Sequence, residues 1–96
     1  MIRHVAVFKW KPDFPAQDLN EWMNRLRALP QQIDELKSLT VGMDVVHGDR
    51  SWDTAVVADL ENLQALRSYN EHPEHQAILK ISAPNIEKLV QVDIEF

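Results

Sequence analysis

Residues 2–10 read IRHVAVFKW, and apolar side chains recur at every second position of this stretch. Because successive side chains of a β-strand point to opposite faces, the even and odd positions can be considered separately. The even positions place five mostly apolar side chains on one face: Ile2, His4, Ala6, Phe8 and Trp10. The odd positions include Val5 and Val7, so both faces of the predicted strand need an apolar cover.

A helical pattern follows this strand. Apolar residues recur at three- and four-residue spacing from Leu19 to Leu36, which is typical of an amphipathic helix. Asp18, with Glu21 three residues later, is a possible N-terminal cap. Pro30 has no amide proton to donate inside a helix, so we expect it to divide the pattern into a long helix and a short helical turn.

The remaining segments complete a recognisable order of elements. Two β-rich runs, 39–46 and 53–60, are joined by HGDRSW, whose Gly-Asp pair suits a hairpin turn. A second helical region, 63–81, contains a proline, and residues 88–96 alternate as a closing strand. The order β-α-β-β-α-β is that of the ferredoxin-like α+β fold, a four-stranded antiparallel sheet with helices on one face. We therefore predict a single domain over residues 1–96, whose bare, apolar sheet face is covered by a second copy of the chain.

The composition narrows the classes of partner. A net charge of −5 over 96 residues should repel nucleic-acid phosphates and anionic lipid surfaces, so we expect neither as a partner. The absence of cysteine excludes disulfides and thiolate catalysis, and it fits a reducing compartment. No apolar run suits a signal peptide or a membrane span. The expectation is a soluble, cytoplasmic homodimer.

The chemistry concentrates in YNEHPEHQ, residues 69–76, which holds two of the four histidines and the only tyrosine. Pro73 suits the first position of a helix, because the amide that it lacks would be unpaired there. His75 then lies in the first helical turn, where the positive end of the helix dipole disfavours an imidazolium and favours a neutral base. His72, directly before the proline, is expected to serve the structure more than the chemistry.

Four segments together resemble the stress-responsive α/β barrel family, called Dabb. They are IRHVAVFKWK at the start, DTAVVADLENLQAL, the motif Tyr69-x-x-His72-Pro73-x-His75, and the ending VDIEF. The resemblance covers essentially the whole chain. It implies a ferredoxin-like subunit that dimerises sheet to sheet into an α+β barrel, which agrees with the two apolar faces of residues 2–10.

The resemblance also implies roles for individual residues. In cyclase members of the family, a histidine of this motif acts as a base and the upstream tyrosine positions the substrate, and the matching residues here are His75 and Tyr69. A histidine of the first strand and an aspartate of the last correspond to His4 and Asp93. If these residues share a pocket with the apolar side chains, its ligand would be a small apolar, phenolic or β-keto compound. The further ligand-contact candidates are Asp93, Phe8, Trp22 and His72.

Two readings of this set stay open. A neutral His75 could remove a proton next to a carbonyl while Tyr69 donates a hydrogen bond to the enolate, which would be cofactor-free cyclase, lyase or isomerase chemistry. Alternatively, the chain is a stress-responsive ligand-binding or dimerisation module without turnover. Cofactor-independent oxygenation is a weaker possibility that rests on fold analogy. No HExxH pattern is present, and Pro73 separates His72 from His75, so we expect no metal.

Overall fold

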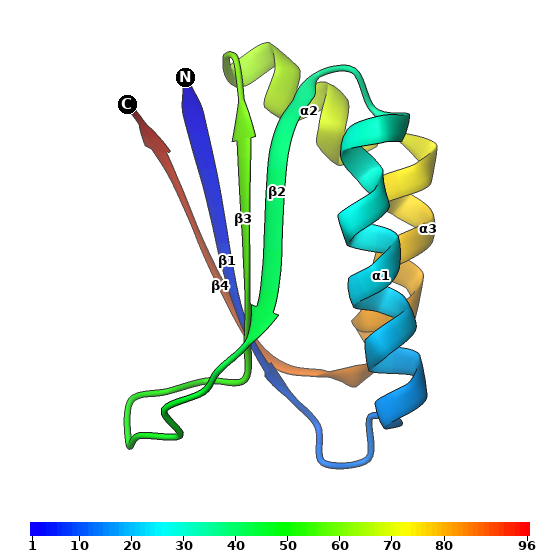
Figure 1. Ribbon diagram of the computed structural model, residues 1–96, viewed down its shortest axis with the longest axis vertical. Coiled ribbons are helices and arrows are strands. Elements are labelled where there is room, and N and C mark those ends of the chain that lie inside the picture. The colour runs from blue at the N-terminus through cyan, green and yellow to red at the C-terminus, as the bar shows by residue number, and fades with distance from the viewer.

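The computed structural model describes residues 1–96 and has the ferredoxin-like α+β architecture. Its elements in chain order are β1 (Ile2–Trp10), α1 (Ala16–Gln32), β2 (Leu36–Met43), β3 (Thr54–Leu60), α2 (Leu63–Glu71), α3 (Pro73–Ser82) and β4 (Ile86–Glu95). A 3₁₀ turn, Ala83–Asn85, leads into β4. The four strands form one antiparallel sheet in the order β2-β3-β1-β4. All helices lie on the same side of this sheet (Figure 1).

The alternation of β1 decides which side chains form the core. Every even position of β1 is buried and every odd position is half-buried, so the even face is the one that meets the helices. Its side chains pack against the inner faces of α1, α2 and α3. The side chains buried most completely in this layer are Trp22, Leu29, Ile33, Leu60, Tyr69 and Ile78.

The first helix differs from the sequence prediction. Pro30 does not divide it, because α1 continues through Pro30 to Gln32. A proline this close to the helix end removes only one intrahelical bond, and the buried Leu26 and Leu29 hold the same stretch against the core. Asp18 is not the cap: Pro15 precedes the helix, no side chain caps it, and Asp18 lies in the first turn, where a negative charge favours the helix dipole.

The β2–β3 connection also differs in detail. Leu36 begins β2, so this strand starts three residues earlier than the predicted run 39–46. In the loop, the left-handed backbone conformation falls on His47, with φ of 58°, and not on Gly48. The carboxylate of Asp44 accepts a hydrogen bond from the His47 amide at 2.6 Å. This local side-chain turn stabilises a conformation that glycine would adopt without help.

The opposite face of the sheet carries apolar side chains that nothing covers. On β4 they are 46–55% exposed, and they are Val90, Val92 and Ile94. Half-buried Val5 and Val7 of β1 lie directly beside Val92 and Val90. A paired Arg3 and Asp59, joined by two hydrogen bonds of 2.8 and 3.0 Å, borders this surface. We call this surface the bare face.

β4 is an edge strand exposed almost along its whole length. Only its first residue is even half-buried, whereas the helices pack against β1, β2 and β3. Its end lies beside the start of the chain, where the Phe96 amide donates to the Met1 carbonyl at 3.0 Å (Figure 1). None of the helices is both long enough and apolar enough to cross a bilayer.

Candidate functional site

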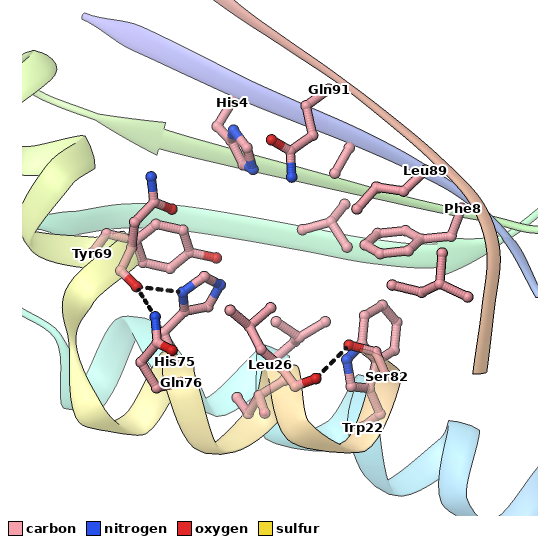
Figure 2. A pocket seen from close by; sticks show the side chains of 16 residues that line it. His4, Phe8, Trp22, Leu26, Tyr69, His75, Gln76, Ser82, Leu89 and Gln91 are labelled. Atoms are coloured by element: carbon pink, nitrogen blue, oxygen red, sulfur yellow. Dashed lines mark hydrogen bonds between the residues drawn. The ribbon is translucent and has the colours of Figure 1, made fainter. Parts of the chain in front are cut away.

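A cavity of about 250 Å³ lies between the sheet and the helices. Most of the residues that line it are hydrophobic, and its polar members come from four separate elements. They are His4 of β1, Tyr69 and Asn70 of α2, His75, Gln76 and Ser82 of α3, and Gln91 of β4. In Figure 2, His4, Tyr69 and His75 gather toward one end of the cavity, and Trp22, Ser82 and Phe8 lie toward the other.

Tyr69 reaches this cavity from the last turns of α2 and is only 1% exposed. Its ring stacks on that of His75, with the centroids 4.2 Å apart. Burial raises the pKa of Tyr69 well above its ordinary value of 10, because the anionic phenolate would lose its hydration. The Tyr69 side chain is therefore a neutral hydrogen-bond donor at any physiological pH.

The position of His75 follows from the start of α3. Pro73 occupies the first turn, as the sequence predicts, and His75 lies in the same turn with its ring buried. Burial lowers the pKa of His75 below its ordinary 6.5, the nearby His4 and His72 lower it further, and the contact with the Asn70 carbonyl opposes them. The imidazole is neutral near pH 7, as a general base must be.

The tautomer of His75 follows from its one backbone partner. Nδ1 lies 3.4 Å from the Asn70 carbonyl oxygen. A carbonyl can only accept, so Nδ1 carries the proton and Nε2 keeps its lone pair. The contact is long for a hydrogen bond, and Gln76 donates to the same oxygen at 2.6 Å. In this tautomer the unshared electron pair of the His75 ring lies on Nε2.

His72 has a different role. Its Nδ1 accepts a hydrogen bond from the Glu74 amide at 3.1 Å and so caps α3. The side chain does not line the cavity. By capping α3, His72 fixes where this helix begins and so positions His75. His72 itself would not contact a ligand in the cavity.

His4 and Asp93 are brought together by the register of β1 and β4. The two residues are directly opposite each other, so their side chains share the face that meets the helices. Nδ1 of His4 lies 2.5 Å from Oδ1 of Asp93. An ionised carboxylate can only accept a hydrogen bond, so the His4 proton lies on Nδ1 and Nε2 is the ring nitrogen without a proton. Asp93 itself does not line the cavity, and it contacts His4, which does.

Phe8 and Trp22, two of the predicted ligand-contact residues, both line the cavity. Their rings meet edge to face with centroids 5.2 Å apart. Sequence reasoning missed Asn70, Gln76, Ser82 and Gln91. Strand alternation could have found Gln91, because it lies two positions before Asp93 on the same face of β4. No motif marks the other three.

Comparisons with known proteins agree with this architecture. The family model of the stress responsive A/B barrel domain, Dabb, matches residues 2–96. A dimeric ferredoxin-like protein of Thermobifida fusca is 36% identical, with a TM-score of 0.89, over 99% of this chain and 90% of that one. A dimeric protein of Bacteroides fragilis with a ferredoxin-like fold is 32% identical, with a TM-score of 0.83, over 99% of this chain and 95% of that one.

A more distant structure shares the fold alone. A hydroxynitrile lyase of Passiflora edulis is 15% identical, with a TM-score of 0.85, over 97% of this chain and 90% of that one. The two dimeric relatives support self-association of this chain. Because the family model matches all but the first residue, the chain belongs to the Dabb family of stress responsive A/B barrel domains.

Proposed function

We propose that this protein is a homodimer that binds a small apolar, phenolic or β-keto compound in the cavity and transfers a proton next to its carbonyl without a cofactor. The observation that carries the proposal is the stacked pair of Tyr69 and His75. A buried neutral imidazole lies against a buried neutral phenol, 4.2 Å between centroids, in a mostly apolar cavity. One group can accept a proton and the other can donate a hydrogen bond at the same pH.

The reaction would proceed through an enolate. Nε2 of His75 takes a proton from the carbon next to the carbonyl, and the electron pair of that C–H bond moves toward the carbonyl oxygen. The Tyr69 hydroxyl donates a hydrogen bond to this oxygen as its charge develops. The apolar walls lower the local dielectric constant, which strengthens that bond. Return of the proton to another atom completes an isomerisation. In a cyclisation, the enolate carbon attacks a second carbonyl of the same compound, and the resulting alkoxide takes the proton back from His75.

His4 and Asp93 supply a second acid–base group. The carboxylate orients the imidazole and would stabilise an imidazolium that forms during the reaction. The His4 ring lies edge-on to Tyr69 with centroids 6.4 Å apart. With its proton on Nδ1, His4 has a lone pair on Nε2, so it can act as a second base that takes a proton from the compound and returns it to the product.

The lyase of Passiflora edulis supports the proposal only through its fold, because it shows that this architecture hosts a lyase. Two features support the homodimer through the bare face. The relatives from Thermobifida fusca and Bacteroides fragilis are dimeric. The bare face also carries a continuous group of exposed apolar side chains, Val90, Val92 and Ile94. The cysteine-free sequence supports a cytoplasmic location.

Binding without turnover is the alternative. It is favoured by the open side of the cavity along β4, where Leu89 and Gln91 are exposed. A site that water enters freely suits reversible ligand binding better than a reaction through an enolate. A protein of this kind would bind a compound saturably and release it unchanged.

The test is an NMR titration of the histidine ring protons in the wild type and in His75→Ala, with and without a panel of β-keto and phenolic compounds. We expect the resonance that His75→Ala removes to titrate below pH 6.5, to move when one compound binds, and that compound to be converted. His47→Ala is the matched control, because His47 is exposed in the β2–β3 loop. Conversion at an unchanged rate in His75→Ala would exclude His75 as the base, and saturable binding without conversion would favour the alternative.

A further inference from the structure

Gln91 of β4 brings a free side-chain amide to the wall of the cavity. Gln91 is paired with Ala6 of β1, and the even positions of β1 face the helices, so the Gln91 side chain points to the same side of the sheet. Figure 2 shows it reaching into the cavity, with no hydrogen bond to the other residues drawn. The residue is exposed, so both water and a ligand can reach the amide.

The register of β1 and β4 sets Gln91 close to the end of the cavity that holds the histidines. Asp93, two positions further along β4, is directly opposite His4. Gln91 is therefore the diagonal neighbour of His4 on the same face, and such neighbours lie about 7–8 Å apart. The His4 ring in turn lies edge-on to Tyr69, with 6.4 Å between centroids. A compact ligand that contacts the Tyr69 hydroxyl can thus extend to the Gln91 amide.

The cavity offers few donors for a second oxygen of a ligand. Both of its histidines hold their proton on Nδ1, so their other ring nitrogen can only accept. The Ser82 hydroxyl and the Gln76 amide already donate to backbone carbonyls, at 3.3 and 2.6 Å. Besides Tyr69, the accessible donors that remain are the side-chain amides of Gln91 and Asn70. Asn70 directly follows Tyr69 on α2, where successive side chains point about 100° apart, so Gln91 is the better placed of the two.

The weak basicity of His75 favours a compound with two carbonyl groups. Burial lowers the pKa of His75, and a weak base removes a proton efficiently only from an acidic carbon. A C–H between two carbonyl groups is more acidic than a C–H beside one, because the electron pair of the broken bond is shared between two oxygens. When Nε2 of His75 takes this proton, both oxygens become partly negative, and a donor aimed at each of them stabilises the charge. Tyr69 supplies one of the two donors.

We infer that Gln91 determines specificity by donating a hydrogen bond from its side-chain amide to the second oxygen of a β-dicarbonyl compound whose first oxygen meets Tyr69. The inference rests on the proposed function and narrows its ligands to the β-keto class. A simple ketone or phenol of the same size has no second oxygen at this place and leaves the Gln91 amide to water. The hydrogen bond forms whether the compound is converted or only bound.

A matched pair of probes tests this assignment. Benzoylacetone and butyrophenone have the same carbon skeleton, and only benzoylacetone has a second carbonyl oxygen. Calorimetric titration gives the ratio of their dissociation constants in the wild type and in Gln91→Met, so the difference in hydration between the two compounds cancels. We expect the preference for benzoylacetone to be about fivefold smaller in Gln91→Met, an effect of about 1 kcal/mol, which is typical of one hydrogen bond. Gln17→Met is the control, because Gln17 is exposed on α1 away from the cavity and should keep the wild-type ratio.

A second measurement uses the wild type alone for binding. We expect benzoylacetone to move the side-chain N–H signals of Gln91 downfield in the NMR spectrum and butyrophenone to leave them nearly in place. The spectrum of Gln91→Met without ligand assigns these signals, because they are absent from it. Equal shifts with both compounds would contradict the inference.

The outcomes separate this inference from the proposed function. If the His75 signal responds to both compounds but the ratio of dissociation constants is the same in Gln91→Met as in the wild type, the proposed site stands and the role of Gln91 is wrong. If Asn70→Ala lowers the ratio and Gln91→Met does not, the second oxygen meets Asn70 and the inference falls. If neither compound moves the His75 signal, the proposed function and this inference fall together.

Discussion

Replacement of Val92 by aspartate tests whether the bare face is the surface through which the protein associates. Val92 lies in the middle of this face, between Val90 and Ile94 along β4 and opposite Val5 of β1. It is 55% exposed in the single chain, so a carboxylate there stays hydrated in a monomer. The substitution should therefore leave the folding of the subunit almost unchanged and act on association.

The expected magnitude follows from this exposure. Covering the exposed half of one valine contributes about 1 kcal/mol to association, and this is lost on substitution. Moving a carboxylate into an apolar interface costs several kcal/mol even after partial rehydration. A two-fold symmetric interface contains the change twice. Each site therefore loses about 4 kcal/mol and the two sites together about 8 kcal/mol, which raises the dissociation constant roughly a millionfold.

Sedimentation velocity over a concentration series measures this change, with circular dichroism to confirm the fold. Leu63→Asp is the control, because Leu63 is 62% exposed at the start of α2 on the helical side of the sheet. We expect this control to associate as the wild type does. A Val92→Asp protein that remains dimeric with an unchanged dissociation constant would show that the subunits meet through another surface.

Three further predictions concern stability. Burial lowers the pKa of His75 below 6.5, so just below that pH the unfolded chain binds a proton that the native protein does not bind. The free energy of unfolding should therefore fall as pH drops below about 6.5. Urea denaturation at several pH values should show a shallower fall for His75→Gln than for the wild type, and identical profiles would contradict the assignment. Leu29→Ala removes a side chain that is 0% exposed and should cost about 2–5 kcal/mol in the same assay, so a loss below 1 kcal/mol would mean that the helix repacks. Asn62 accepts a hydrogen bond from the Ala65 amide at 2.8 Å, and Asn62→Ala should cost about 1 kcal/mol, whereas Asn62→Asp keeps the cap and should match the wild type.

The sequence contains enough information to predict the faces of the sheet. The period-two alternation of β1 separates its even positions from its odd ones, and the structure places the even positions against the helices. The same alternation in β4 separates Leu89, Gln91 and Asp93 from the valines of the bare face. The pattern separates the two faces because successive side chains of a strand point to opposite sides of the sheet.

Other features depend on information that a local pattern does not hold. His4 and Asp93 are 89 positions apart in the sequence, so predicting their contact requires knowing the register between β1 and β4. Several neighbouring registers would fit the same hydrophobic pattern. The continuation of α1 through Pro30 depends on tertiary packing, which outweighs local propensity. The left-handed residue of the β2–β3 loop is set by the carboxylate of Asp44 and so escapes a rule based on glycine. The buried indole Nε1 of Trp22 has no hydrogen-bond partner within the protein, and this could be recognised only after every neighbour had been placed.

The strand order has a consequence for how the protein is made. β1 is the earliest of the four strands of this sheet to be synthesised, yet its neighbours β3 and β4 are the two latest. Ile2 pairs with Leu60 on one side and with Glu95 on the other. Contacts between such distant segments form slowly, because the intervening chain must first be closed into a loop. Until β3 has emerged, β1 is therefore an apolar strand with two free edges, which is a site for aggregation, and its second edge can be paired only after β4 has left the ribosome.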